Sequence, residues 1–180
     1  MLALLNEPHG FADPVEHGFG IHVCQLRPQS RGTISLVSDN PLAPARIDPN
    51  YLSAPEDARI LREGVKNVRR LMSQPSLQTL ISREAAPWST IDLDDDAATD
   101  EAIRSKAETI YHPVGTCAMG PKDQSTSVVD PSLKVIGLDG LRVVDASVMP
   151  RLIGGNTNAP TIMIAEKCAD MIKRELTAAP

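Results

Sequence analysis

The chain has 180 residues, of which 18 are Lys or Arg and 23 are Asp or Glu, so its formal net charge is −5. No basic cluster or basic stripe with interleaved aromatics occurs, which argues against nucleic acid as a partner. No apolar run reaches the roughly 18–20 residues of a membrane-spanning helix, and the first residues lack the basic region of a secretory signal. We therefore expect a soluble, cytoplasmic protein without a transmembrane segment.

The three cysteines, Cys24, Cys117 and Cys168, are widely separated and form no CxxC or Cys/His spacing. Zinc sites need such spacing, so we expect reduced, structural cysteines and no metal site. Fifteen prolines against 3% aromatic residues indicate many fixed turns and long connections. This balance is unusual for a compact domain and suggests part of a larger protein.

The first part of the chain has a strand pattern after an irregular start. Residues 1–17 lack periodicity, and we expect them to be a connection. Alternating side chains predict a strand over residues 18–26, and RGTISLVS at residues 31–38 predicts a second one. An antiparallel pair is the simplest arrangement. Residues 39–52 contain three prolines and are expected to form turns and short extended pieces.

A helix signature begins at Ser53. Serine is a common N-cap, Pro55 suits the first turn, and Glu56 stands three residues after the serine, as a capping box requires. Apolar residues then recur at helical spacing as far as Met72. The pattern predicts one amphipathic helix that ends at Met72.

An acidic run opens the segment of residues 92–109. A calcium loop needs a glycine at its sharp turn and a distal glutamate, and the run has neither at the required spacing. We interpret it as the solvated start of a helix capped by Thr99 or Asp100.

Residues 110–160 have no long helical pattern. VVDPS at residues 128–132 and VVDAS at residues 143–147 predict short strands that end in polar turns, on either side of a GLDG turn. From Ala159 to Leu176 the apolar residues again recur at helical spacing, which predicts a C-terminal helix.

Two segments contain residue types that folding alone does not require: IYHPVGTCAMG at residues 110–120 and RLIGGNTNAPT at residues 151–161. The second places Gly and Asn at a helix start, where free backbone N–H groups and the helix dipole favour an anion. Taken singly, a His beside a Pro is most often a turn residue and an Asn before a helix is most often a cap. Their order along the chain, with VVDAS between them, is more informative.

That combination resembles the C-terminal part of the glucose–methanol–choline (GMC) oxidoreductase family, in particular its choline dehydrogenases and related alcohol dehydrogenases. The resemblance extends from RPQSRGTISL and ARIDPNYL through YHPVGTCAMG and VVDPSLKVIGLDGLRVVDASVMP to NTNAPTIMIAEKCADMI. It implies an FAD-dependent oxidoreductase that oxidises a primary, choline-like alcohol to the aldehyde by hydride transfer to flavin N5. The electron acceptor stays unknown.

The resemblance also implies roles for single residues. His112 matches the histidine that accepts the hydroxyl proton, and Asn156 matches the second member of the catalytic pair, which would orient the substrate oxygen by hydrogen bonding. Ile110 matches a side chain near the substrate pocket. The residues that match cofactor-binding positions are Asp145, Ala146, Asn158, Ala159, Pro160 and Thr161.

The resemblance implies an α+β fold. Residues 1–109 would contribute an antiparallel sheet with packed helices to the substrate-binding domain, and residues 110–180 the catalytic loop and the return into the FAD-binding domain. No GxGxxG turn occurs in the sequence, although complete members hold the ADP half of FAD there. We therefore expect a fragment without the N-terminal Rossmann part, inactive by itself and with little or no affinity for FAD. A strand near residues 141–145 would lack neighbours and could pair in a homodimer.

Two other functions fit the same sequence. A hydroxynitrile lyase would use this fold without net redox chemistry, and a non-catalytic interaction domain would follow if His112 and Asn156 do not converge. A choline-like cation would need an aromatic or acidic cage, for which Trp88, Tyr51 and Tyr111 are among the few aromatics. Peripheral association of the parent protein with a membrane stays open.

Overall fold

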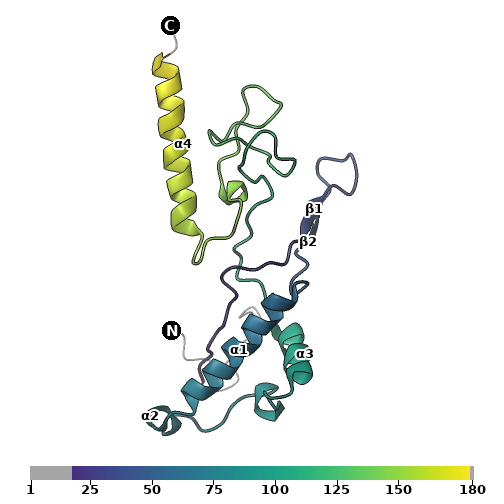
Figure 1. The fold of residues 1–180 in the computed structure, drawn as a ribbon, viewed down its shortest axis with the longest axis vertical. Helices are drawn as coiled ribbons and strands as arrows, with labels where there is room; N and C mark the ends of the chain where they lie inside the picture. Colours follow the sequence, from purple (N-terminus) through teal and green to yellow (C-terminus); the bar gives the residue numbers. More distant parts are fainter. Residues whose placement is uncertain (1–17, 179–180) are drawn as a thin grey trace. The chain divides into compact units, whose positions relative to one another are not determined.

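The computed structural model describes residues 18–178, so the connection expected over residues 1–17 lies outside the described part. In chain order the elements are β1 (Thr33–Ser35), β2 (Arg46–Asp48), α1 (Pro55–Met72), α2 (Pro75–Gln78), the 3₁₀ turn η2 (Trp88–Thr90), α3 (Asp96–Lys106), the 3₁₀ turn η3 (Ala146–Val148) and α4 (Asn158–Ala178) (Figure 1). Helices with one small antiparallel sheet confirm the predicted α+β class.

The chain divides into two compact units. The first contains residues 18–25, 29–31 and 50–109, and the second contains residues 26–28, 32–49 and 110–178. One division therefore falls between Thr109 and Ile110. Residues 32–49, however, group with the C-terminal part of the chain.

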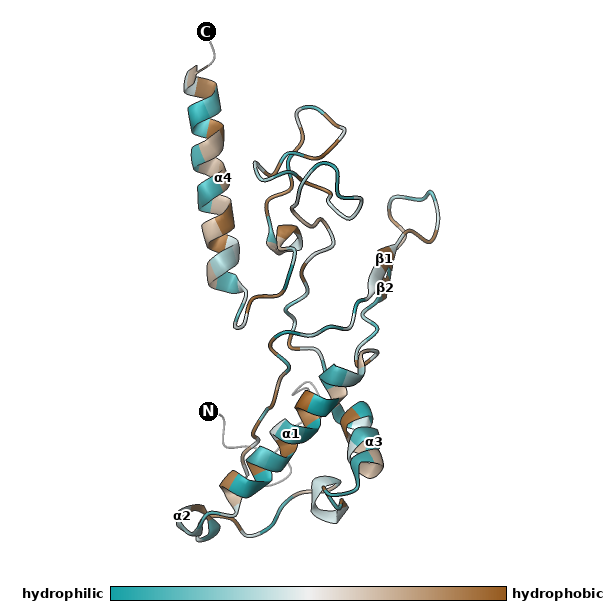
Figure 2. Cartoon of the chain, in the orientation of Figure 1, coloured by the Kyte–Doolittle hydropathy of each residue, from teal (hydrophilic) through white to brown (hydrophobic). Residues whose placement is uncertain are grey.

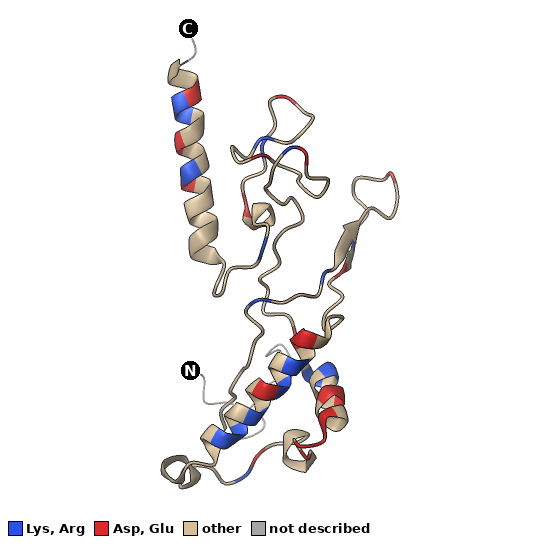
Figure 3. Ribbon diagram, viewed as in Figure 1, with Lys and Arg blue, Asp and Glu red and all other residues tan. Residues whose placement is uncertain are grey.

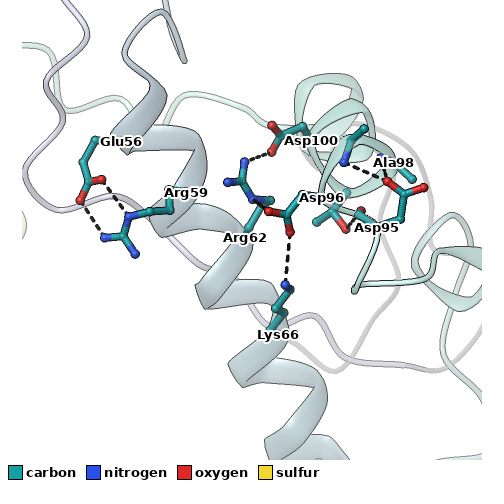
Figure 4. A network of polar contacts seen from close by, with 10 residues as sticks. Glu56, Arg59, Arg62, Lys66, Asp95, Asp96, Ala98 and Asp100 are labelled. Atoms are coloured by element: carbon teal, nitrogen blue, oxygen red, sulfur yellow. Dashed lines mark hydrogen bonds and ion pairs between the residues drawn. The ribbon is translucent and has the colours of Figure 1, made fainter.

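Helix α1 forms as predicted, but its cap differs. The N-cap residue is Ala54, with Pro55 in the first turn and no side-chain cap. The predicted capping box is wrong because the Glu56 carboxylate binds the guanidinium of Arg59 one turn later, at 2.7–2.8 Å (Figure 4). The helix ends at Met72, as its apolar pattern predicted.

A buried carboxylate, Asp57, fastens the segment before β1 to the start of α1. Its oxygens accept hydrogen bonds from the backbone N–H groups of Gln29 (2.9 Å) and Ser30 (2.9 Å) and from the Ser30 hydroxyl (2.6 Å). Only 2% of Asp57 is exposed. The Ser30 hydroxyl oxygen in turn accepts from the N–H of Ala54 at 3.0 Å, so the helix start and the chain before β1 share one network.

The strand predicted over residues 18–26 is wrong. Those residues form no ladder, and Val23 instead lies against Gly64 of α1, where any side chain larger than hydrogen would collide with it. The second predicted strand, residues 31–38, is confirmed in part as β1, which pairs antiparallel with β2 and places Ile34 opposite Ile47. The alternating pattern was correct for one strand but did not identify its partner.

Helix α3 begins earlier than its predicted cap. The Asp95 carboxylate accepts from the N–H groups of Ala97 and Ala98, each at 3.0 Å, and so caps the helix. The predicted caps Thr99 and Asp100 are wrong: both lie inside α3, where Thr99 is buried and its hydroxyl donates to the Asp95 carbonyl oxygen. The acidic run thus supplies the cap one turn before the expected position.

Ion pairs join α3 to α1. Arg62 donates to the Asp100 carboxylate at 2.6 Å, and Lys66 reaches Asp96 at 3.3 Å (Figure 4). Beneath them Ala58, Ala102 and Ile103 are buried. The residues of the acidic run therefore serve helix packing, and no group of potential metal-binding side chains occurs among the described residues.

The core of the second unit is built mainly from loops. Val129, Leu133, Val148 and Cys168 are buried together, with Ile164 and Met171 of α4 among the side chains packed against them. The short strands predicted at residues 128–132 and 143–147, and near 141–145, are wrong, because isolated bridges such as Val129–Val135 and Lys134–Arg142 replace a ladder. Val129 alone bridges to two different segments, at Met119 and at Val135, and none of these bridges extends into a strand.

Helix α4 confirms the predicted C-terminal helix. Its first two turns carry no charged residue, and its charged residues begin at Glu166 and continue toward the C-terminal end (Figure 3). There Glu175 accepts from Arg142 at 2.7 Å and pairs with Lys134 at 3.2 Å. Hydrophobic residues recur along the helix between hydrophilic ones (Figure 2). No described helix is both long and apolar enough to cross a membrane.

The Asp57 network predicts an acid-sensitive contribution to stability. Burial raises the pKa of this carboxyl, but hydrogen bonds from the Ser30 hydroxyl and from the N–H groups of Gln29 and Ser30 outweigh burial, so the pKa is lowered. Since folding favours the carboxylate, its contribution is complete above about pH 4 and is lost as the pH falls through the lowered pKa. Asp57→Asn should reduce the free energy of unfolding in urea at pH 7 by about 1–3 kcal/mol.

Exposed Glu63 on the same helix offers the control. Glu63→Gln should change the unfolding free energy much less, and Asp57→Asn should show a shallower loss of stability below pH 4 than the parent chain. Equal stability of the Asp57→Asn and Glu63→Gln variants would contradict the assignment.

Candidate active site

The loop that contains His112 has an unusual backbone. Tyr111, immediately before the histidine, has φ +59°, and Gly115 after it has φ +88°. Residues other than glycine seldom adopt positive φ, and such conformations often mark functional sites. The loop thus turns sharply on both sides of His112.

Backbone hydrogen bonds attach this loop to the segment before α4. The N–H groups of Cys117 and Met119 donate to the carbonyl oxygens of Ser147 (3.0 Å) and Val148 (2.9 Å). On the other side, Gly120 donates to the Val129 carbonyl oxygen at 3.0 Å. The residues after His112 are therefore held between the segment at residues 147–148 and the segment at Val129. We call these three hydrogen bonds the loop ladder.

The side chain of His112 is half-buried and forms no hydrogen bond within the described part of the chain. The imidazole is thus available to a ligand as donor or acceptor. Ile110, two residues earlier, is 49% exposed.

Asn156 stands two residues before α4 and is exposed, and its carboxamide forms no hydrogen bond within residues 18–178. Helix α4 begins with Asn158, Ala159 and Pro160, and Thr161 closes the first turn by donating from its N–H (3.0 Å) and hydroxyl (2.7 Å) to the Thr157 carbonyl oxygen. A helix start without charged side chains presents the positive end of its dipole.

Asp145 and Ala146 lie at the N-terminal end of η3. One oxygen of the Asp145 carboxylate, Oδ1, accepts from the N–H of Ser147 at 2.8 Å and from its hydroxyl. The other oxygen accepts no hydrogen bond within the described residues. Because the loop ladder binds Ser147 and Val148, Asp145 is held close to the loop that follows His112.

A mainly apolar cavity of about 350 Å³ lies within the second unit. Its lining includes Met119 of the loop, Val148 at the end of η3 with Met149 after it, and Pro160 and Ile164 of α4. Neither His112 nor Asn156, both described residues, lines it. The structure thus brings the His112 loop and the segment after Asp145 together, and no hydrogen bond joins His112 to Asn156 among the described residues.

Comparison with known proteins identifies the family of this chain. The family model described as GMC oxidoreductase matches residues 28–165. The chain belongs to the GMC oxidoreductase family. It is 52% identical over 171 residues to an alcohol dehydrogenase [acceptor] of Pseudomonas putida, which covers 95% of this chain and 30% of the relative.

Two further similar proteins are also oxidoreductases by name. Oxygen-dependent choline dehydrogenase 1 of Chromohalobacter salexigens is 45% identical over 157 residues, covering 87% of this chain and 28% of the relative. The structure of an FAD-dependent oxidoreductase from Chaetomium thermophilum superposes with a TM-score of 0.79 at 35% identity, covering 86% of this chain and 26% of that one. The chain thus spans less than a third of the length of these relatives.

The residues expected to bind FAD are chemically suited to it. The open oxygen of Asp145 can accept from a ribityl hydroxyl, and the uncharged start of α4 can face the electron-rich edge of a flavin ring. A Cβ atom at Gly155, just before the helix, would meet no atom within 4 Å, so the backbone there is open to a neighbour.

Sequence reasoning missed Tyr111 as a structural feature of the site. A tyrosine gives no indication of positive φ, whereas Gly115 does, because glycine is the usual residue for that conformation. The positive φ of both residues on either side of His112 is seen only in the structure.

The loop conformation can be tested by comparing two glycines with similar φ. Gly115→Ala introduces a Cβ at φ +88° and 3.3 Å from the Met149 carbonyl oxygen, whereas Gly137→Ala introduces one at φ +84° with no heavy atom within 4 Å. Gly115→Ala should lower the free energy of unfolding by about 1–3 kcal/mol, and Gly137→Ala by less. An equal loss for both, measured in urea, would mean that the approach to Met149 contributes nothing.

Proposed function

We propose that this chain contributes the catalytic pair and part of the flavin site to an FAD-dependent oxidoreductase that oxidises a primary alcohol to the aldehyde. The observation that supports it most is the loop ladder, which holds the loop after His112 against the residues after Asp145. Membership of the GMC family, with alcohol and choline dehydrogenases among the relatives, supports the reaction class.

In this proposal His112 accepts the proton of the substrate hydroxyl. Its imidazole has no partner within the described residues, so it can bind that hydroxyl without first breaking a protein hydrogen bond. Asn156 cannot titrate, and its amide N–H₂ would donate to the same oxygen as negative charge develops there. The two side chains would thus divide proton transfer and orientation between them.

The cofactor would lie against Asp145, Ala146 and the first turn of α4, namely Asn158, Ala159, Pro160 and Thr161. When bound, FAD accepts the hydride from the carbinol carbon at N5. The positive end of the α4 dipole would stabilise the negative charge that hydride transfer places on the flavin ring.

The substrate we propose is a small primary alcohol, choline-like in the first instance, with Ile110 near its pocket. A relative named choline dehydrogenase supports this choice. We further propose that residues 1–109 belong to the substrate-binding domain and residues 110–180 to the catalytic loop and the flavin-side return.

The isolated 180-residue chain should bind FAD weakly or not at all and turn over no alcohol. It spans 30% of the length of its Pseudomonas relative, and its sequence holds no GxGxxG turn for the pyrophosphate. The purified chain, supplied with FAD and desalted, should show no flavin absorption near ~450 nm. A retained flavin spectrum would contradict this.

The homodimer expected from the sequence stays a prediction, which sedimentation of the same sample tests.

The catalytic roles require a chimera in which this chain replaces the matching C-terminal part of the Pseudomonas relative. In that chimera His112→Ala should lower kcat for alcohol oxidation by about 10²–10⁴-fold because the base is lost. Asn156→Ala should lower kcat by about 10²-fold because a donor to the reacting oxygen is lost. Dye reduction by alcohol measures both.

Exposed His22 supplies the matched control, since His22→Ala removes the same side chain outside the proposed site. Full activity of the His112→Ala chimera, with flavin bound, would rule out His112 as the base.

A further inference from the structure

The guanidinium of Arg27 lies against the glycine turn that leads into Asn156. Residues 26–28 belong to the same compact unit as residues 110–178. Within that unit Arg27 Nη1 donates to the Leu152 carbonyl oxygen at 3.5 Å, and the guanidinium covers Gly154. A segment 125 residues away in sequence thus contacts the turn.

The two glycines of the turn have different surroundings. A Cβ atom built on Gly154 would lie 3.0 Å from Arg27 Nη2 and 3.4 Å from its Cζ, which is closer than ordinary van der Waals contact. A Cβ atom on Gly155 would meet nothing within 4 Å. Gly154 therefore leaves room for the arginine, whereas Gly155 leaves room for something outside the described residues or for solvent.

A turn of two consecutive glycines has high conformational freedom, which must be lost before the next residue has a defined position. The carboxamide of Asn156 forms no hydrogen bond of its own within the described chain. Its position consequently depends on the backbone of the turn. The planar guanidinium, which can bind a carbonyl oxygen and lie flat on a glycine at once, restricts that backbone.

We propose that Arg27 is a positioning residue for Asn156: it holds the turn at residues 152–155 and thereby fixes the place of the carboxamide. This inference rests on the proposed function only where it refers to catalysis. Arg27 acts through the turn and is not itself a catalytic residue. Displacement of a reacting group by about 1 Å can cost about 10²-fold in rate, so the contact has a measurable consequence.

The first experiment uses the 180-residue chain and does not need FAD. {¹H}–¹⁵N heteronuclear NOE values are measured for the amides of residues 153–156 in the parent chain and in four variants. Arg27→Ala and Gly154→Ala should both lower these values, the first by removing the guanidinium and the second by displacing it. Gly155→Ala should leave them unchanged, and so should Arg151→Ala, which removes an exposed charge beside the turn.

The double variant Arg27→Ala/Gly154→Ala should resemble Arg27→Ala alone, because the displaced group is already absent. Arg27→Lys keeps the charge but not the planar fork, so it should resemble Arg27→Ala and guards against loss of folding caused by the truncation. Unchanged NOE values in both Arg27 variants, or equal effects of Gly154→Ala and Gly155→Ala, would overturn the proposal.

The second experiment uses the Pseudomonas chimera. Arg27→Ala should lower kcat by about 10–100-fold with little change in KM and with flavin absorption retained. In the Asn156→Ala background the same substitution should have no further effect on kcat. Additive losses would show that Arg27 acts elsewhere and would overturn the positioning role.

The results of the two experiments distinguish failure of the proposed function from failure of the positioning role. If Asn156→Ala leaves the chimera fully active, the catalytic role of Asn156 is wrong, and the NOE values alone decide whether Arg27 holds the turn.

Discussion

The loop ladder is the constraint on which the candidate site depends. In the unit that contains His112, the described strands β1 and β2 form a two-stranded sheet that does not include the His112 loop. That loop is instead held by three backbone hydrogen bonds, from Cys117, Met119 and Gly120. They link the His112 loop to two segments that also contribute Val129 and Val148 to the core. Buried backbone groups must find partners, and here those partners position a loop beside the residues that follow Asp145. An irregular segment thereby becomes a defined support for the loop that contains the candidate residue His112.

Charged side chains and candidate catalytic side chains serve different purposes in this protein. Several charged side chains hold the fold together: Asp57 anchors the chain before β1, Arg62 and Lys66 join α1 to α3, and Glu175 binds Arg142. By contrast, His112 and Asn156 form no hydrogen bond within the described residues. Polar groups that are neither deeply buried nor paired are the ones that can bind a substrate oxygen without a rearrangement of the fold.

Local patterns predicted the helices well and the strands poorly. Helical periodicity identified α1 to its last residue and α4 to within two residues at its C-terminal end. Alternation could not identify the partner of a strand, and within the alternating residues Val23 packs against Gly64 of α1 instead of joining a ladder. Asp95 caps α3 although Thr99 and Asp100 are equally good cap types, and only packing distinguishes them. For the site, ordered motifs identified the family, but the positive φ of Tyr111 and the contact of Arg27 with the turn depend on tertiary structure and have no sequence signal.

If His112 and Asn156 serve alcohol oxidation as proposed, an enzyme that contains this chain should transfer hydride from an alcohol to its flavin. In the most direct test, the Pseudomonas chimera is mixed under anaerobic conditions with an alcohol that is either protiated or deuterated at the carbinol carbon. Flavin absorption is then followed in a stopped-flow instrument. The account predicts that the flavin is reduced, and that the deuterated alcohol reduces it more slowly than the protiated one because hydride transfer breaks that C–H bond. Absence of flavin reduction, or release of cyanide from a hydroxynitrile without it, would contradict the account.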